Sequence, residues 1–261
     1  KYILDKLSEI EKRQGIKIIY AVESGSRLWG IDDDESDYDV RFVYVKPIND
    51  YLSIHQEHDN CTMIEGKYDF VGFDIKKFAK LLLKSNPTCI EWLNSSIKYV
   101  EKFHFYDGFK YHINYNCNLY ALFQHYISMA RANYHKYIES KSSPNKKKFK
   151  HVVRALLCAK YITLFHSIPP ENIMVVEYFQ ICEAYAYKYA CGDVFLLNSE
   201  EEKIKKIIEY IQRMFDELEK VKRDVLEDRD RKIDYELVNH VIVNNIRYYG
   251  YASLSELGIV T

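Results

Sequence analysis

The stretch of sequence that decides the fold runs from Glu23 to Val45 and reads ESGSRLWGIDDDESDYDVRFVYV. It follows a short apolar run, Ile16–Val22, whose isoleucine-rich composition predicts a buried strand. Gly25-Ser26 interrupts that pattern, and Tyr38–Val45 then alternates as a second strand does. We therefore expect a strand, a turn, a short helix and a second strand in close succession.

The Gly25-Ser26 pair stands where the first strand meets the short helix. Glycine lets the backbone approach a ligand closely, because it has no side chain in the way. The N-terminus of a helix offers free N–H groups and a partial positive charge, which suit a phosphate. The pair is thus a candidate phosphate-binding turn.

Asp37-Tyr38-Asp39 opens the second strand. Residues i and i+2 of a strand point to the same side, so the two carboxylates are expected to share one face, roughly 6–7 Å apart. Such a pair can hold two divalent cations about 3.5–4 Å apart, and hard oxygen ligands favour Mg²⁺ or Mn²⁺. The neighbouring acidic run Asp32–Glu35 is expected to be an exposed loop.

The rest of the first part continues the mixed pattern. Apolar residues recur at helical spacing over 2–13, and Lys67–Phe73 predicts a third strand. Asp74 is expected to cap a helix that carries Ile75, Phe78, Leu81 and Leu82. Asn86-Pro87 predicts the start of a further helix, as cap and first helical residue.

The second part is predicted to be helical, because chain breakers become scarce. Only Gly192 appears between Gly108 and Gly250, and no proline follows Pro170. The expected helices cover 117–139, 148–166, about 171–190, 199–225 and 235–248. We therefore predict an α+β protein: a small mixed sheet over residues 1–100 that carries the site, and a helical domain over residues 101–261 that closes over the nucleotide.

Composition limits the classes of function. The chain has 261 residues, of which 48% are hydrophobic and 29% charged, a balance typical of a globular protein. The sequence contains no run of about 18 apolar residues, so no membrane-spanning helix is predicted. The net charge is -1, so a nucleic acid must meet a local basic patch. Six scattered cysteines without a C-x-x-C pair argue against a zinc site and predict free thiols in the cytoplasm.

A strand, Gly-Ser, about ten residues and then Asp-x-Asp entering a strand resembles the DNA polymerase beta-type nucleotidyltransferase superfamily. The segments ESGSRLWG, SDYDVRFVYV, DFVGFDIKKF and LLLKSNPTCIEWL are similar to successive motifs of one branch, the RNA repair pathway DNA polymerase beta family. HYISMARANYHKY and KKFKHVVRALL also resemble that branch, so the resemblance covers roughly residues 15–170.

The resemblance implies a mechanism. A nucleoside triphosphate binds with its phosphates against Gly25-Ser26, and Asp37 and Asp39 hold two Mg²⁺ or Mn²⁺ ions. A third carboxylate on the next strand helps activate an acceptor hydroxyl, which attacks the α-phosphate while pyrophosphate leaves. Asp69 is the preferred third carboxylate because its context is strand-like. Asp74, which stands at a helix cap, is the alternative.

The sequence does not identify the acceptor of the nucleotide. The family name favours an RNA or tRNA end. A protein partner modified by nucleotide transfer is one alternative, and a catalytically idle nucleotide-binding regulator is another. A membrane partner is not expected.

Several other residues match positions of these motifs, and each allows both a functional and a structural role. Arg27 and Arg41 are candidate phosphate ligands, or salt-bridge partners of nearby carboxylates. Glu23 either takes part in the chemistry or braces the turn. Lys148 and Arg154 lie in a segment with seven Lys or Arg and no acidic residue between Ser140 and Pro170. They are expected to contact the nucleotide, with a solvated basic face as the alternative.

Two further patterns favour structural roles. Asn133, Tyr134 and Tyr137 offer groups that can stack on a base, but most of the 24 tyrosines are expected to be packing residues. His55 and His58 have metal-ligand spacing without a helix or strand to support it, so we expect surface residues.

Overall fold

The computed structural model describes residues 1–30, 32–54, 58–102, 105–139, 146–175, 200–222 and 230–256. The chain forms two compact units. The sheet unit comprises Lys1–Leu28, Asp32–Asn116 and Lys232–Thr261, and the helical unit comprises Trp29–Ile31 and Cys117–Arg231. The fold is α+β, as the sequence predicts.

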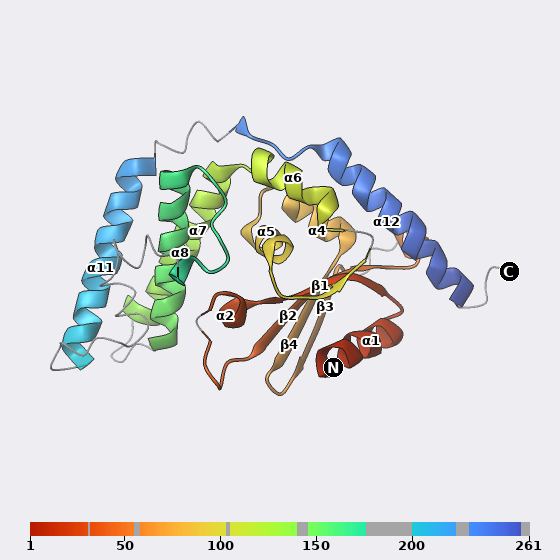
Figure 1. The fold of residues 1–261 in the computed structure, drawn as a ribbon, viewed down its shortest axis with the longest axis horizontal. Coiled ribbons are helices and arrows are strands. Elements are labelled where there is room, and N and C mark those ends of the chain that lie inside the picture. The colour runs from red at the N-terminus through yellow and green to blue at the C-terminus, as the bar shows by residue number, and fades with distance from the viewer. Residues whose placement is uncertain are drawn as a thin grey trace. The chain divides into compact units, whose positions relative to one another are not determined.

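Within the described residues the sheet unit contains one five-stranded mixed sheet in the order β3-β4-β2-β1-β5 (Figure 1). The strands are β1 (Lys17–Ser24), β2 (Tyr38–Val45), β3 (Asn60–Glu65), β4 (Tyr68–Asp74) and β5 (Lys98–Glu101). β2 and β4 run parallel, whereas the other neighbours are antiparallel. The segment between Val45 and Tyr68 therefore carries the chain across to a parallel neighbour, and β3 forms one edge of the sheet.

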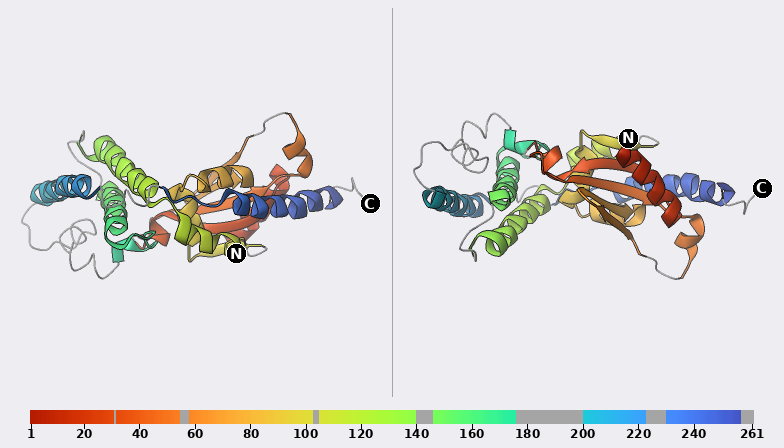
Figure 2. Two further views of the ribbon diagram at one scale, coloured as in Figure 1. Left: turned by 90° about the horizontal axis from the view of Figure 1, so that it is seen from above. Right: turned by 90° about the horizontal axis from the view of Figure 1, so that it is seen from below.

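Helix α1 (Tyr2–Gln14) covers one face of the sheet, as the view from below shows (Figure 2). Its Leu7 and Ile10 pack with alternate residues of the strands, including Val40, Phe42 and Phe70. Because side chains alternate along a strand, Asp39 and Arg41 of β2 face the opposite way.

The opposite face carries α4 (Ile75–Leu82) and α5 (Pro87–Asn94) (Figure 1). Trp92 of α5 stacks on Phe73 of β4 with ring centroids 4.6 Å apart, and its carbonyl oxygen accepts a hydrogen bond from the Tyr20 hydroxyl. These contacts involve Phe73, at the end of β4 remote from Tyr68. Asp39 of β2 and Asp69 of β4 lie toward the opposite strand ends, near Tyr38 and Tyr68.

Both predicted helix caps are confirmed. The Asp74 side chain accepts a hydrogen bond from the Lys76 N–H at 2.8 Å. Asn86 accepts one from the Thr88 N–H at 2.9 Å, and Pro87 occupies the first turn of α5. Each cap satisfies an N–H group that the helix itself cannot pair.

Among its described residues the sheet unit also contains α2 (Gly25–Leu28), α3 (Ile48–Leu52), α6 (Asp107–Asn116) and α12 (Tyr235–Glu256). Helix α12 packs against α3 and α4. The units thus divide the chain differently from the predicted ranges 1–100 and 101–261, because α6 and α12 belong with the sheet.

The described part of the helical unit contains α7 (Leu119–Tyr134), η1 (His135–Glu139), α8 (Lys146–Phe165), η2 (Ile173–Val175) and α11 (Glu200–Val221). Helix α8 packs against both α7 and α11, with Val152, Leu156 and Ala159 fully buried. The predicted helix at 171–190 falls mainly on 176–199, outside the described residues. No helix among the described residues is long and apolar enough to cross a membrane.

Candidate active site

The turn at Gly25 admits only glycine, for two independent reasons. Gly25 has a φ of 65°, in the left-handed region that residues with a side chain rarely adopt. A Cβ built on Gly25 would lie 1.8 Å from Oδ2 of Asp39, which is an impossible approach. Gly25 therefore lets the carboxylate of Asp39 lie directly against the backbone of the turn. This is the proximity that the sequence predicts for the two motifs.

Asp39 on β2 lies directly beside Asp69 on β4, because the two residues are register partners in the parallel pair. Nη2 of Arg41 donates to Oδ1 of Asp39 at 2.7 Å and to Oδ2 of Asp69 at 2.9 Å. Nη1 of the same guanidinium donates to the main-chain carbonyl oxygen of Asp69 at 3.0 Å. One cation is thus shared by two carboxylates from different strands.

Asp37 stands just before β2 and is exposed. Its carbonyl oxygen accepts a hydrogen bond from Nε of Arg27 at 3.1 Å. The charge of Asp37 also contributes to raising the pKa of Asp39. Asp37 is therefore electrostatically coupled to Asp39 at the open end of the strand.

The pKa of Asp39 is raised above its ordinary value. Burial is the largest cause, because removal from water disfavours the charged form. The charge of Arg41 works in the opposite direction, and the charges of Asp69 and Asp37 add to the increase. The site thus concentrates negative charge that one guanidinium only partly compensates, which is the electrostatic setting that a further cation would relieve.

Glu23 braces the start of β2 from inside the protein. Only 1% of its surface is exposed, and its Oε1 accepts the main-chain N–H of Asp39 at 2.8 Å. Its Oε2 accepts a hydrogen bond from the Tyr99 hydroxyl of β5. Burial raises the pKa of Glu23, whereas these two hydrogen bonds lower it. The geometry supports the bracing interpretation of Glu23, since both oxygens face inward partners.

Tyr99 and Ser95, which no sequence pattern indicates as functional, also support Glu23. Tyr99 holds Glu23, and the Ser95 hydroxyl donates to the main-chain carbonyl oxygen of Glu23 at 2.8 Å. Both follow α5, more than 70 positions after Glu23. Their roles depend on the pairing of β5 with β1, which a local sequence pattern does not reveal.

Arg27 fastens the acidic loop to the turn. Its guanidinium donates to the main-chain carbonyl oxygen of Ser36 at 2.7 Å and lies 3.9 Å from the centre of the Tyr38 ring. It also forms an ion pair with Asp32 at 3.5 Å. Within the described contacts Arg27 thus holds the loop in place, and its role as a phosphate ligand stays a prediction.

The structure separates the two candidates for the third carboxylate. Asp69 lies beside Asp39, whereas Asp74 is at the other end of β4. Asp74 is buried, caps α4 and accepts a hydrogen bond from the Tyr51 hydroxyl at 2.8 Å. Both of its oxygens thus have structural partners, whereas Asp69 lies beside Asp39 and shares Arg41 with it.

The basic residues predicted to contact nucleotide lie in the helical unit. Arg154 is only 3% exposed, and its guanidinium stacks 3.8 Å from the centre of the Trp29 ring. Lys148 belongs to the first turn of α8, but its side chain is outside the described part of the structure. A nucleotide contact by either residue stays a prediction.

The aromatic candidates of the same unit have packing roles. The Tyr134 hydroxyl accepts a hydrogen bond from Nε2 of Gln212 at 3.2 Å, and its ring packs edge-on against Phe215. Tyr134, the last residue of α7, is accordingly buried against α11. Tyr137 contacts the ammonium of Lys136. These contacts fit the expectation that most tyrosines pack.

Asp39 and Asp69 fit a divalent cation in one specific respect. A positively charged nitrogen already lies within hydrogen-bond distance of one oxygen from each, so the pair is spaced to share a cation. The donors are hard carboxylate oxygens, which Mg²⁺ and Mn²⁺ prefer. Among the described residues, no three His, Cys, Asp or Glu side chains converge on one point. The arrangement therefore fits a cation held by Asp39 and Asp69, with Asp37 exposed just before β2.

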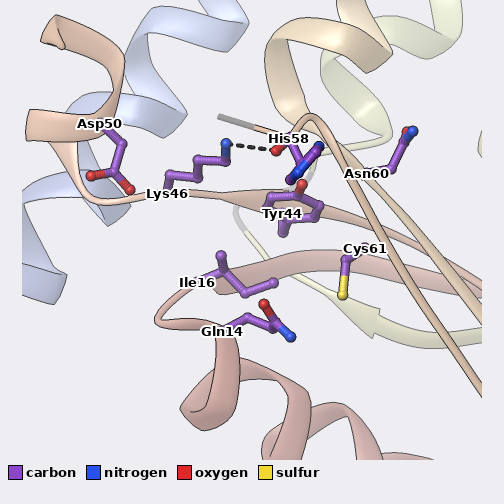
Figure 3. Close-up of a pocket in the computed structure, with 8 residues that line it drawn as sticks. All are labelled: Gln14, Ile16, Tyr44, Lys46, Asp50, His58, Asn60 and Cys61. Carbon is purple, nitrogen blue, oxygen red and sulfur yellow. Dashed lines mark hydrogen bonds between the residues drawn. The ribbon is translucent and has the colours of Figure 1, made fainter. Parts of the chain in front are cut away.

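A cavity of about 550 Å³ lies at the other end of β2 (Figure 3). Nζ of Lys46 donates there to the main-chain carbonyl oxygen of His58 at 2.7 Å. The lining residues are Gln14, Ile16, Tyr44, Lys46, Asp50, His58, Asn60 and Cys61. The cavity does not include Asp37, Asp39 or Asp69. His58 contributes to its wall, whereas His55 is outside the described residues.

Comparison with known proteins identifies relatives. The chain is 40% identical over 175 residues to the protein YcgL of Bacillus subtilis (strain 168), covering 67% of each chain. It is 34% identical over 142 residues to the protein MJ0002 of Methanocaldococcus jannaschii, covering 52% of this chain and 56% of that protein.

A nucleotidyltransferase-like protein from Exiguobacterium sibiricum 255-15 is structurally similar with a TM-score of 0.38 and 11% identity, over 95% of this chain and 88% of that one. The family model described as the RNA repair pathway DNA polymerase beta family matches residues 1–244. The match takes in the Gly25 turn, Asp37, Asp39 and Asp69 as well as the helical unit. The chain therefore belongs to the RNA repair pathway DNA polymerase beta family.

Proposed function

We propose that this protein is a metal-dependent nucleotidyltransferase that transfers an NMP from an NTP to the hydroxyl of an RNA or tRNA end and releases pyrophosphate. The observation that carries the proposal is the register of β2 and β4. It sets Asp39 beside Asp69, while Gly25 brings the turn after β1 against the same carboxylate. Family membership supports nucleotidyl transfer in general, and the substrates are our own inference.

The residues divide the task by position. The backbone of the Gly25-Ser26 turn binds the triphosphate, since it is partly exposed and lies beside Asp39 at the start of a helical turn. Asp37, Asp39 and Asp69 are the residues that would hold two Mg²⁺ or Mn²⁺ ions. Bound there, the ions supply Lewis-acid stabilisation of charge on the phosphate oxygens.

The remaining steps belong to side chains of the chain itself. Asp69 accepts the proton of the attacking hydroxyl, because among the three proposed ligands its strand lies farthest from the Gly25-Ser26 turn. Arg41 keeps Asp39 and Asp69 oriented through one oxygen of each. Glu23 fixes the main chain at Asp39, so that the carboxylate does not move as charge builds up nearby.

The test is an assay with labelled NTPs, Mg²⁺ or Mn²⁺ and total RNA, scored for pyrophosphate and for label on RNA. The wild-type protein is expected to label RNA with at least one NTP. Asp39→Asn is expected to abolish labelling, and Asp5→Asn, which changes an exposed aspartate of α1, should have no effect.

Two other results would point elsewhere. Label recovered on a co-purified protein instead of RNA would indicate a protein acceptor. NTP binding without pyrophosphate release from any acceptor would indicate a nucleotide-binding regulator. A cytoplasmic location is part of the same proposal.

A further inference from the structure

Four residues form a row across the sheet at the level of the carboxylates. Ser24 of β1 is the register partner of Asp39, Asp39 that of Asp69, and Asp69 that of Ile64 on β3. Register partners on neighbouring strands point to the same face, and neighbouring strands lie about 4.8 Å apart. The row therefore runs from the phosphate-binding turn, through both carboxylates, to an isoleucine at the edge of the sheet.

Ile64 is exposed although it is apolar and in a strand. Its relative exposure is 73%, whereas the neighbouring Met63 and Cys61 are partly buried against the α1 face. Thr62 and Val71, which are register partners, continue the same face one row further along. We call Thr62, Ile64 and Val71 the edge platform. It carries no charge, and it continues directly from Asp69.

The chemistry of transfer decides which side of the carboxylates the platform serves. In phosphoryl transfer the attacking and leaving oxygens lie roughly in line, on opposite sides of phosphorus. Pyrophosphate is the leaving group and binds at the Gly25-Ser26 turn, on the β1 side of Asp39. The acceptor hydroxyl must then approach from the β3 side of Asp69.

We propose that the edge platform binds the acceptor, and that its occupant is the terminal nucleoside of an RNA, whose base packs on Ile64 while its ribose hydroxyl reaches Asp69. This inference rests on the proposed function. The acceptor oxygen forms a bond to the α-phosphorus as the bond from phosphorus to the bridging oxygen breaks. Pyrophosphate keeps that electron pair, and the hydroxyl proton passes to Asp69 and then to water.

Geometry favours a nucleoside over an extended peptide. A peptide beside an edge strand adds as a further strand, which would set its side chains roughly 10 Å from Asp69, two strand spacings away. A base and the hydroxyl of its own ribose are separated by about one strand spacing, which matches the step from Ile64 to Asp69. An uncharged platform also suits a base better than a phosphate.

The test measures RNA affinity separately from nucleotide affinity. Two short fluorescein-labelled oligoribonucleotides serve as probes. One is unmodified, and the other has an abasic 3′ residue that keeps its hydroxyl. Binding is measured in the presence of Mg²⁺ and a non-reactive ATP analogue. The variants are Ile64→Gln and Ile64→Tyr. The matched control is Leu52→Gln, because Leu52 is 76% exposed, in the same unit and outside the platform.

Ile64→Gln is expected to weaken oligonucleotide binding about tenfold, and Ile64→Tyr to strengthen it, because an aromatic ring stacks better on a base. Leu52→Gln and the affinity for the ATP analogue should not change. The abasic probe should bind the wild type and Ile64→Gln equally weakly.

Equal binding of both probes to the wild type, or unchanged binding by Ile64→Gln, would overturn the platform while leaving the nucleotidyltransferase proposal intact. Label on a protein in place of RNA would overturn the nucleoside occupant. Failure of the proposed function itself has a different signature, which is the absence of pyrophosphate release by the wild type with every acceptor.

Discussion

Oδ2 of Asp39 occupies the space that a side chain at residue 25 would need, at 1.8 Å from the position of a Cβ on Gly25. The turn and the carboxylate are therefore a single fitted arrangement, in which neither can change without displacing the other.

Gly25→Ala is expected to reduce nucleotidyl transfer by about a hundredfold or more, because the methyl group must push the carboxylate of Asp39 away from its site. Gly15→Ala is the control. Gly15 has nearly the same φ, 61° against 65°, but nothing lies within 4 Å of its Cβ position. Gly15→Ala should lose roughly 1–2 kcal/mol of stability because of its backbone conformation, and Gly25→Ala at least as much. Equal loss of activity in the two would contradict the assignment of Gly25.

Arg41→Gln is expected to shift the acid limb of the pH–rate profile to higher pH. Arg41 lowers the pKa of Asp39, while burial and the neighbouring carboxylates raise it. Without Arg41 that pKa rises further, so Asp39 becomes protonated, and unable to bind a cation, at a higher pH. The measurement is kcat/KM against pH for the wild type, Arg41→Gln and, as control, Arg213→Gln on the exposed side of α11.

Asp69→Ala and Asp74→Ala should separate chemistry from stability. Asp69→Ala is expected to cost roughly 4 kcal/mol of transition-state stabilisation, about a thousandfold in rate, with little change in unfolding. Asp74→Ala removes a helix cap and the partner of Tyr51, so it should destabilise by about 1–2 kcal/mol while the folded protein stays active. Denaturant unfolding and the transfer assay on both proteins check this. The reverse pattern would make Asp74 the third carboxylate.

Tyr99→Phe is expected to destabilise the sheet unit in a pH-dependent way. The pKa of Glu23 is already raised by burial, and the hydrogen bond from Tyr99 is the first of the effects that lower it. Losing that bond raises the pKa further. A carboxyl group whose pKa is raised on folding stabilises the protein below its unfolded pKa, and that stability is lost as the pH rises through the folded value.

Tyr99→Phe should therefore cost about 1–2 kcal/mol at neutral pH and less as the pH falls toward 4.5. Chemical unfolding at several pH values measures the difference. Tyr235→Phe, at an exposed position on α12, should show no such pH dependence. A constant difference at all pH values would show that Glu23 is not involved.

Local patterns were sufficient to predict most of the elements near the site. The strands at Ile16–Val22 and Tyr38–Val45 correspond to β1 and β2, and the caps at Asp74 and Asn86 are present as expected. These features depend on residues a few positions apart, which is why the sequence reveals them.

Features that depend on pairing were not predictable in the same way. Strands β3 and β5 are not predicted from the sequence, because an edge strand such as Asn60–Glu65 is mostly exposed, and its alternation of Cys61 and Met63 with polar residues is short and ends at the exposed Ile64. The shared guanidinium illustrates the same limit. Strand alternation places Arg41 on the face of Asp39, but its contact with Asp69 follows from the register of β2 and β4. The inward bracing by Tyr99 likewise requires a strand paired from a distant segment.

Helix α12 has a consequence for how the molecule is made. It packs against α3 and α4, so the sheet unit combines residues from both ends of the described chain. The helical unit is almost contiguous, and a ribosome delivers all of Cys117–Arg231 before it delivers α12. During synthesis the sheet unit therefore leaves the surface of α3 and α4 uncovered, and accessible to chaperones, until α12 has been made and packs on it.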